Sequence, residues 1–310
     1  MSRPPTLIVR GRELDLAEPV LMGIVNASPD SFSDRGETRT TAERVALALD
    51  QVAQGAGIVD VGGQSGITGV PEIPVEEEIA RVLPVVEGIR EAAPDVVVSV
   101  DTYRPAVVEA VLEAGAAIVN DVSGLLYPEV ATLVAEAGAG LVLMHTRARP
   151  KHKVLDDALY AEVGGVTADV VAFLRQRLEV ALEAGVDPRA TILDPGPDFA
   201  KTPAQTVEVL RDLDAVEAIG RPLLLALSRK DFIGAITHRP PRARLGGTLA
   251  AVGHVADRPG VILRVHDVGV VADYLAVAAV LAGRRDLPAG ARLPEELRRE
   301  PAPGDDDGTA

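Results

Sequence analysis

Short apolar stretches rich in β-branched residues alternate along the chain with longer stretches whose apolar positions recur every three or four residues. The short stretches predict parallel strands that are buried on both faces. The longer ones predict amphipathic helices, as Ile79, Val82, Leu83 and Val86 illustrate. Strands are expected at 21–26, 58–62, 96–101, 117–121, 141–145, 191–194, 223–228 and 262–266, and helices at 41–54, 76–92, 105–114, 129–137, 166–184, 204–218, 244–256 and 270–282.

Eight strand-plus-helix units predict an α/β fold, a closed (β/α)8 TIM barrel in a single domain. A doubly wound open sheet is the alternative, but no glycine-rich dinucleotide loop follows the first strand. Residues 6–16 alternate in hydropathy and predict a short N-terminal hairpin, which could close the lower end of the barrel. We expect a barrel domain over residues 1–290 and a disordered acidic tail over residues 291–310.

Composition excludes several classes of protein. The formal net charge of −15 disfavours nucleic-acid binding, which depends on basic patches. The absence of cysteine excludes disulfides, thiolate metal sites and cysteine nucleophiles. No apolar run reaches the roughly 18 residues of a membrane span, and no signal-peptide pattern is present, so a cytoplasmic protein is expected.

Several predicted strands end in an acid or an amide. Because the carboxyl ends of barrel strands meet at one face, these side chains are expected around a single mouth. They are Asn26, Asp60, Asp101, Asn120 and Asp194. Together they suit a ligand with both donors and acceptors, such as an aminopyrimidinone edge; helix caps and Asx turns are the alternative. Asn26 could also bind a hydrated cation, whereas Asp121 is expected to be structural.

Basic side chains follow the last two strands. Arg264 and His266 are two residues apart and therefore share one face of their strand. With Lys230 they could neutralise a diphosphate, because the tops of the seventh and eighth strands commonly hold phosphates. Either Arg229 or Lys230 is expected in a surface salt bridge, and the isolated His145 is expected to be structural.

The ordered motifs of residues 20–283 resemble those of dihydropteroate synthase, a pterin-binding family. They are Met22-Gly-Ile-Val-Asn-Ala-Ser-Pro-Asp-Ser-Phe-Ser-Asp, Asp60-Val-Gly-Gly, Ser99-Val-Asp-Thr, Ile118-Val-Asn-Asp-Val-Ser-Gly, Leu143-Met-His, Asp194-Pro-Gly, Phe199-Ala-Lys-Thr, Ser228-Arg-Lys, Gly247-Thr-Leu-Ala and Arg264-Val-His-Asp-Val. No single motif is specific, but their combination and order are.

The resemblance implies a homodimeric transferase. Its reaction joins 6-hydroxymethyl-7,8-dihydropterin diphosphate to 4-aminobenzoate, giving 7,8-dihydropteroate and diphosphate with Mg2+ present. The implied mechanism is dissociative, with electrostatic stabilisation of the leaving group and no covalent enzyme intermediate. The implied pterin-binding residues are Asp101, Asn120, Asp194 and Lys230; the implied Mg2+–diphosphate residues are Asn26, Arg264 and His266; Phe32, in the aminobenzoate subsite, and Phe199 are further candidate substrate contacts.

The chain departs from the family pattern at several positions. Gly66 and Ile67 replace an expected Thr and Arg, Asp198 replaces a Gly, and the segment after His145 also differs. Loss of a charged donor to diphosphate could cost about 1.5–3 kcal/mol. Three hypotheses therefore remain: an active synthase, a binding or regulatory relative with little synthase activity, and a methyltransfer-type barrel. The basic residues after the last two strands argue against the third.

Overall fold

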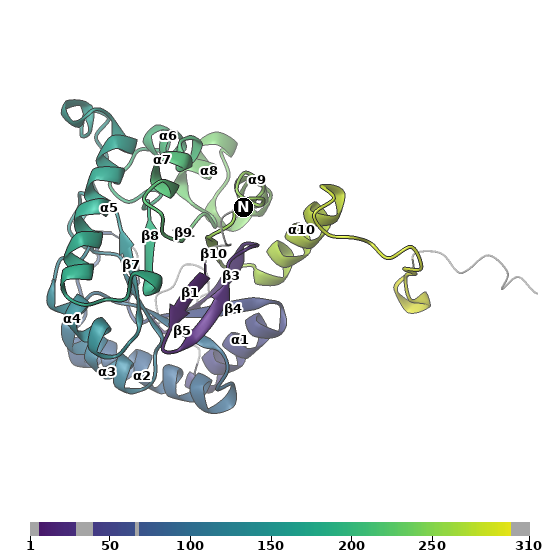
Figure 1. The fold of residues 1–310 in the computed structure, drawn as a ribbon, viewed down its shortest axis with the longest axis horizontal. Coiled ribbons are helices and arrows are strands. Elements are labelled where there is room, and N and C mark those ends of the chain that lie inside the picture. The colour runs from purple at the N-terminus through teal and green to yellow at the C-terminus, as the bar shows by residue number, and fades with distance from the viewer. Residues whose placement is uncertain (1–5, 29–39, 66–67, 299–310) are drawn as a thin grey trace, which may run out of the picture.

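The computed structural model describes residues 6–28, 40–65 and 68–298. Its centre is a closed barrel of parallel strands in the order β10-β3-β4-β5-β6-β7-β8-β9, which confirms the predicted TIM barrel (Figure 1). The barrel strands are β3 (Val20–Asn26), β4 (Ala56–Gly62), β5 (Val97–Asp101), β6 (Ile118–Asp121), β7 (Gly140–Met144), β8 (Thr191–Asp194), β9 (Leu223–Leu225) and β10 (Val261–Val265).

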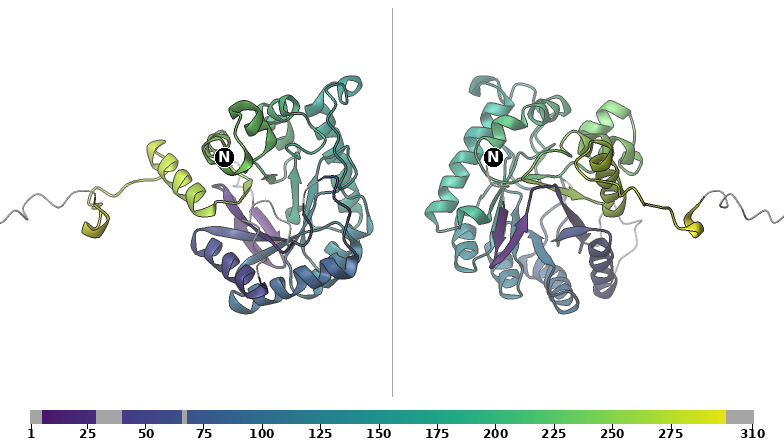
Figure 2. Two further views of the ribbon diagram at one scale, coloured as in Figure 1. Left: turned by 180° about the vertical axis from the view of Figure 1, so that it is seen from behind. Right: turned by 45° about the vertical axis from the view of Figure 1, so that its right-hand side comes forward.

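The predicted hairpin forms from β1 (Thr6–Val9) and β2 (Arg12–Asp15) and closes one end of the barrel (Figure 2). Its backbone is hydrogen-bonded to the segments that precede β7 and β10, through Arg10 N to Gly138 O at 2.8 Å and Gly260 N to Leu16 O at 2.7 Å. The buried hairpin side chains pack against the first residues of the strands. This end is therefore sealed, and the carboxyl ends of the strands form the open mouth.

An outer ring of helices covers the strands (Figure 1). Their bounds are α1 (Thr41–Ala53), α2 (Val75–Ala92), α3 (Pro105–Glu113), α4 (Glu129–Glu136), α5 (Val166–Glu183), α6 (Pro203–Arg211), α7 (Leu213–Glu217), α8 (Asp231–Thr237), α9 (Leu245–Gly253) and α10 (Val268–Leu281); short 3-10 helices lie at Ala161–Val163, Pro188–Ala190, Pro241–Ala243 and Glu295–Leu297. Apolar side chains fill the space between the strands and the ring. Because aromatic residues are few, this core consists mainly of Val, Leu, Ile and Ala.

The structure corrects the prediction in the second half of the barrel. The predicted helix 204–218 is divided into α6 and α7 at Asp212, whose φ and ψ of −113° and 34° are not helical. Strand β9 ends at Leu225, and α8 was not predicted. A helix of only 7 residues gives a weak periodic signal, which explains the omission.

The described part of the C-terminal region, up to residue 298, leaves the barrel after α10. It contains the short helix Glu295–Leu297 within the predicted tail, and residues 299–310 lie outside the described residues. Among the described residues, no helix is long and apolar enough to cross a membrane.

Candidate active site

A buried carboxylate from β4, Asp60, connects four strands at the mouth of the barrel. It accepts hydrogen bonds from Ser99 Oγ at 2.6 Å, Asn120 Nδ2 at 3.1 Å and Arg264 Nε at 2.7 Å. Its side chain is fully buried, and an unpaired charge there would be costly. The three donors, from β5, β6 and β10, therefore make this charge tolerable and fix the relative positions of the strands.

Arg264 extends this network to a second acid. Its Nη2 donates to Asp101 Oδ2 at 3.0 Å, so that one guanidinium joins Asp60 and Asp101. Burial raises the pKa of Asp101 to about 7, while Arg264 acts to lower it and the Asp60 carboxylate acts to raise it. The Asp101 side chain is still 27% exposed, so it faces the mouth as an acceptor whose charge changes near neutral pH.

Asn120 and Asp194 add polar atoms to the same mouth. Asn120 uses its amide nitrogen on Asp60, whereas its buried Oδ1 has no hydrogen-bond partner among the described residues. Asp194 Oδ1 accepts from Gly196 N at 2.7 Å. Burial raises the pKa of Asp194 to about 6, against the opposing charges of Lys230, Lys201 and Arg264. A ligand with N–H donors would satisfy the acceptors that the protein leaves open.

Lys230 lies at the start of α8 and is held by the loop after β8. Its Nζ donates to Pro197 O at 3.0 Å and lies 4.5 Å from the centre of the Phe199 ring, a cation–π contact. Burial lowers the pKa of Lys230, and the carboxylates of Asp198 and Asp194 oppose this effect. The structure thus brings Phe199 and Lys230 together, as two of the predicted substrate contacts.

His266 contacts Ser228 rather than an acid. Its Nδ1 lies 3.0 Å from Ser228 Oγ, and burial, together with Arg229 and Arg264, lowers the pKa of His266 to about 4. The imidazole is therefore neutral at pH 7 in the free protein and offers a hydrogen bond rather than a positive charge. Arg229 forms an ion pair with Asp267 at 2.8 Å, so it is Arg229, and not Lys230, that makes the expected salt bridge.

Two residues that were expected to be structural hold the backbone around the mouth. Asp121 accepts hydrogen bonds from the amide and hydroxyl of Ser123 and stabilises a turn. His145 is fully buried; its Nε2 contacts Asp169 Oδ2 at 2.9 Å and its Nδ1 contacts Lys201 Nζ at 2.7 Å. Burial lowers the pKa of His145 to about 4, so the ring is neutral and can bond to both neighbours.

Lys201 stabilises the loop after β8 through hydrogen bonds to its backbone. It is almost fully buried, and its Nζ also donates to Gly196 O at 3.0 Å and Phe199 O at 3.1 Å. Burial lowers the pKa of Lys201 to about 7. These hydrogen bonds from Lys201 hold the segment between β8 and α6, which is neither helix nor strand and carries Phe199.

The structure gathers most of the predicted residues at one mouth. Asp101, Asn120 and Arg264 belong to one hydrogen-bonded network, and charges couple Asp194 and Lys230 to Arg264. Asn26 ends β3, which pairs with β4 and β10 beside this network. The predicted contact Phe32 and the departures Gly66 and Ile67 lie outside the described residues.

The sequence analysis assigned no role to Ser99, Ser228 or Lys201, and it named Asp60 as an acid that ends an apolar run without giving it a specific role. Asp60 carried a usable signal, because an acid inside the apolar run Ile58-Val-Asp-Val is costly unless it has a partner. The roles of the other three depend on which strands and loops become neighbours, which their local sequence does not encode.

The described residues form no metal centre of their own, so a magnesium ion would have to be held mainly by a phosphorylated ligand. No group of three or more His, Asp or Glu side chains that could hold a metal exists within residues 6–28, 40–65 and 68–298. Mg2+ usually keeps several waters and is bound through substrate phosphates with one or two protein oxygens. The Asn26 carboxamide could supply one such oxygen, and the Arg264 guanidinium could face the same ligand.

Comparison with known proteins agrees with this geometry. Residues 22–266 match the pterin binding enzyme family. Dihydropteroate synthase of Synechocystis sp. is 37% identical over 281 residues, which cover 90% of this chain and 96% of the relative. The enzyme of Bacillus subtilis is 38% identical over 254 residues, covering 82% of this chain and 85% of the relative.

Solved structures give the same result. Xanthomonas albilineans dihydropteroate synthase with 4-aminobenzoic acid matches with a TM-score of 0.80 at 38% identity, covering 92% of this chain and 100% of that chain. A structure of the same enzyme with 7,8-dihydropteroate has a TM-score of 0.77 at 38% identity and the same coverage. The chain therefore belongs to the pterin binding enzyme family and, within it, to the dihydropteroate synthases.

Proposed function

We propose that this protein condenses 6-hydroxymethyl-7,8-dihydropterin diphosphate with 4-aminobenzoate to give 7,8-dihydropteroate and diphosphate. The proposal rests on one hydrogen-bonded network. In it, Arg264 bridges Asp60 and Asp101, and Asn120 leaves a buried acceptor oxygen without a partner among the described residues. It offers hydrogen-bond acceptors for a flat heterocycle beside a cation for its leaving group. Relatives in the same family are dihydropteroate synthases, one of which was solved with the product 7,8-dihydropteroate.

The pterin is proposed to bind between the acids and Lys230. Asp101, Asn120 and Asp194 accept from its amino and ring N–H groups, and Lys230 donates to its carbonyl or ring nitrogen. A carboxylate acceptor requires Asp101 to be ionised, and bound N–H donors favour that form. The pocket thereby stabilises positive charge that develops on the pterin as its diphosphate departs.

The leaving diphosphate is proposed to bind Arg264 and His266. The carbon–oxygen bond between the pterin methylene and diphosphate breaks with its electron pair on oxygen. The aminobenzoate nitrogen then bonds to the methylene carbon and loses a proton to solvent. Arg264 neutralises the departing oxygens, and neutral His266 donates a hydrogen bond. When bound, Mg2+ supplies further neutralisation of the diphosphate, with Asn26 as its proposed protein ligand.

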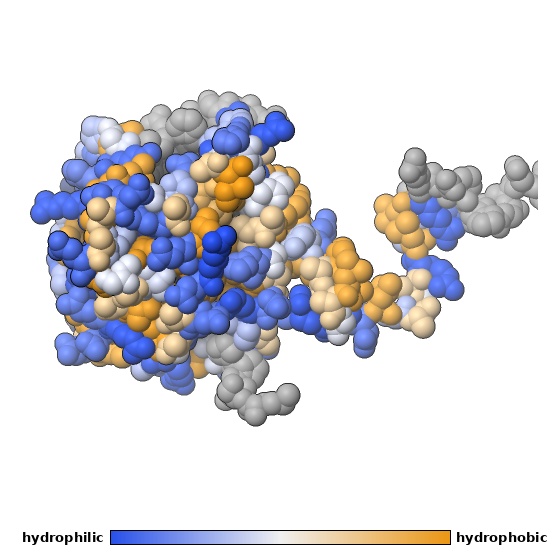
Figure 3. Space-filling view, turned by 90° about the horizontal axis from the view of Figure 1, so that it is seen from above, coloured by the Kyte–Doolittle hydropathy of each residue, from blue (hydrophilic) through white to orange (hydrophobic). Residues whose placement is uncertain are grey.

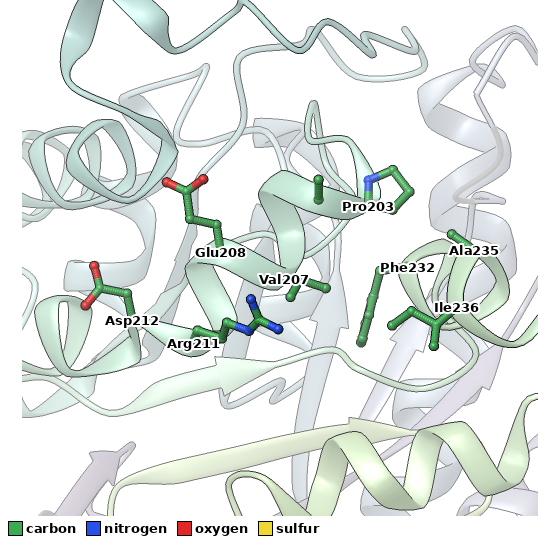
Figure 4. Close-up of a pocket in the computed structure, with 9 residues that line it drawn as sticks. Pro203, Val207, Glu208, Arg211, Asp212, Phe232, Ala235 and Ile236 are labelled. Atoms are coloured by element: carbon green, nitrogen blue, oxygen red, sulfur yellow. The ribbon is translucent and has the colours of Figure 1, made fainter.

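The proposal includes a cytoplasmic homodimer. An apolar groove between α6 and α8 contains Val207, Phe232 and Ile236, and the Ile236 side chain is 66% exposed (Figure 4). Apolar side chains also cover the part of α10 that projects from the barrel, where Val277 and Leu281 are exposed (Figure 3). Contiguous exposed apolar surface is typical of association sites. Light scattering on the purified chain measures its mass in solution, and a monomer at micromolar concentration would contradict the proposed homodimer.

The decisive experiment supplies the purified protein with pterin diphosphate, 4-aminobenzoate and Mg2+. Release of diphosphate and formation of dihydropteroate in equal amounts is the expected result, and both should fall when EDTA removes Mg2+. Binding of pterin diphosphate without turnover would instead support the binding or regulatory hypothesis. Turnover that needs no diphosphate on the pterin would support the methyltransfer hypothesis.

A further inference from the structure

The loop after β8 and the start of α8 are joined by the side chain of Asp198. Its Oδ2 accepts from the backbone N of Asp231 at 2.5 Å, and its Oδ1 accepts from the Thr206 hydroxyl at 3.1 Å. The Asp198 amide in turn donates to Thr206 Oγ1 at 3.1 Å. The carboxylate therefore binds the first residue of α8 while α6 holds it in place.

Asp198 has a backbone conformation that few side chains adopt. Its φ is 65°, in the left-handed region that favours glycine, although aspartate tolerates it better than most residues. Such a conformation is unfavourable for an L-residue because its Cβ crowds the following carbonyl oxygen. Two hydrogen bonds through the carboxylate and one through the backbone hold it in this conformation.

The residue next to Asp231 is Lys230, whose ammonium lies against the same loop. Lys230 Nζ donates to Pro197 O, and the Phe199 ring lies beneath it. Asp198 lies between Pro197 and Phe199 in sequence, and its carboxylate is fixed on Asp231. Burial lowers the pKa of Lys230, and Asp198 is the largest of the charges that oppose this effect.

We infer that Asp198 is a positioning residue: its carboxylate ties the start of α8 to the loop after β8, and this places Lys230 over the pterin site with a carboxylate on the loop that holds it. The inference rests on the proposed function, in which a protonated Lys230 contacts the pterin. Several other charged or titratable groups from neighbouring elements also face Lys230, so the effect of Asp198 must be separated from theirs. They are Asp194, Lys201, Asp231, Arg264 and His266.

Two substitutions distinguish the effect of the negative charge of Asp198 from the effect of its position. Asp198→Asn keeps the shape, an acceptor oxygen and tolerance of a left-handed φ, but it removes the charge. Thr206→Val removes the hydroxyl that orients the carboxylate, but it leaves the charge. We would measure kcat and KM for both substrates between pH 6 and pH 10 for each variant. The calorimetric Kd for pterin diphosphate would be measured over the same range.

Removal of the carboxylate should move the alkaline limb of kcat/KM for pterin diphosphate toward lower pH. Without the opposing charge, Lys230 loses its proton at lower pH, while the KM for aminobenzoate should change less than about twofold. Thr206→Val should lower kcat/KM by about three- to tenfold at every pH and leave the limb in place. In a Lys230→Met background, Asp198→Asn should have no further effect on the pH dependence of Kd.

A pH profile of Asp198→Asn that coincides with that of the wild type would overturn the inference. A shift in Kd that persists in the Lys230→Met background would also overturn it, since the charge would then act on another group. Failure of the wild type to form dihydropteroate would overturn the proposed function instead. The binding measurement does not depend on turnover, so it tests Asp198 in either case.

Discussion

Asp60→Asn is the substitution that most directly tests the architecture of the mouth. The change keeps the volume and removes one buried negative charge. Arg264 would then keep only Asp101 as an ionised partner, and Asn120 would donate to a neutral oxygen. Pterin binding should weaken at least about tenfold, because Asn120 and Arg264 lose the anchor that orients both.

The size of the stability loss follows from burial. Breaking a fully buried ion pair costs about 3–5 kcal/mol, and the value should be lower where one partner remains paired. Arg264 is 19% exposed and retains Asp101, so we expect about 2–4 kcal/mol for Asp60→Asn. In a chain of 310 residues, that loss corresponds to a decrease in Tm of about 3–6 °C.

The matched control is Ser99→Ala, which removes one hydrogen bond to Asp60 and leaves Arg264 untouched. It should cost about 1–2 kcal/mol. Urea denaturation followed by circular dichroism gives the free energy of unfolding of both variants, and calorimetry gives pterin affinity. If Asp60→Asn is no less stable than Ser99→Ala, the carboxylate does not organise the mouth as described.

Three further results are expected. Lys230→Ala and Arg264→Ala should each lower turnover about a hundredfold or more with the circular dichroism spectrum unchanged. Arg229→Ala is the control and should lower turnover less than about fivefold, because it breaks only a partly exposed ion pair. Near-normal activity of Lys230→Ala and Arg264→Ala would contradict the site assignment. Since the pKa of Asp101 is raised to about 7, its carboxylate is protonated below that pH, so pterin affinity should decrease as pH falls through 7. Asp101→Asn should bind weakly and lose the change near pH 7, keeping only a decrease near pH 6 from Asp194; calorimetry between pH 5.5 and pH 8.5 tests this. Ile67→Arg should raise diphosphate affinity by restoring a charged donor, and an unchanged Kd would show that residue 67 does not contribute to that site.

Much of the fold followed from the sequence because its elements are strongly periodic. All eight barrel strands were located, since buried parallel strands are apolar runs that end in polar residues. The short α8 and the break at Asp212 were missed, because a few residues do not establish a period. The departure at Asp198 was visible in the sequence, but its contact with Asp231 was not, because 33 residues separate the two.

Local hydropathy was enough to establish where most of the barrel strands end, and therefore which side chains lie at one face of the barrel. Strand direction and side-chain alternation follow from the backbone, so no long-range information is needed for this step. How these side chains pair became known only from the folded chain. Arg264 reaches Asp60 across 204 residues of chain, and the two meet because the last barrel strand closes against the first, which brings β4 near. Charged side chains that are buried where the barrel closes need partners of opposite charge. The closed arrangement of the strands decides which side chains are close enough to be those partners.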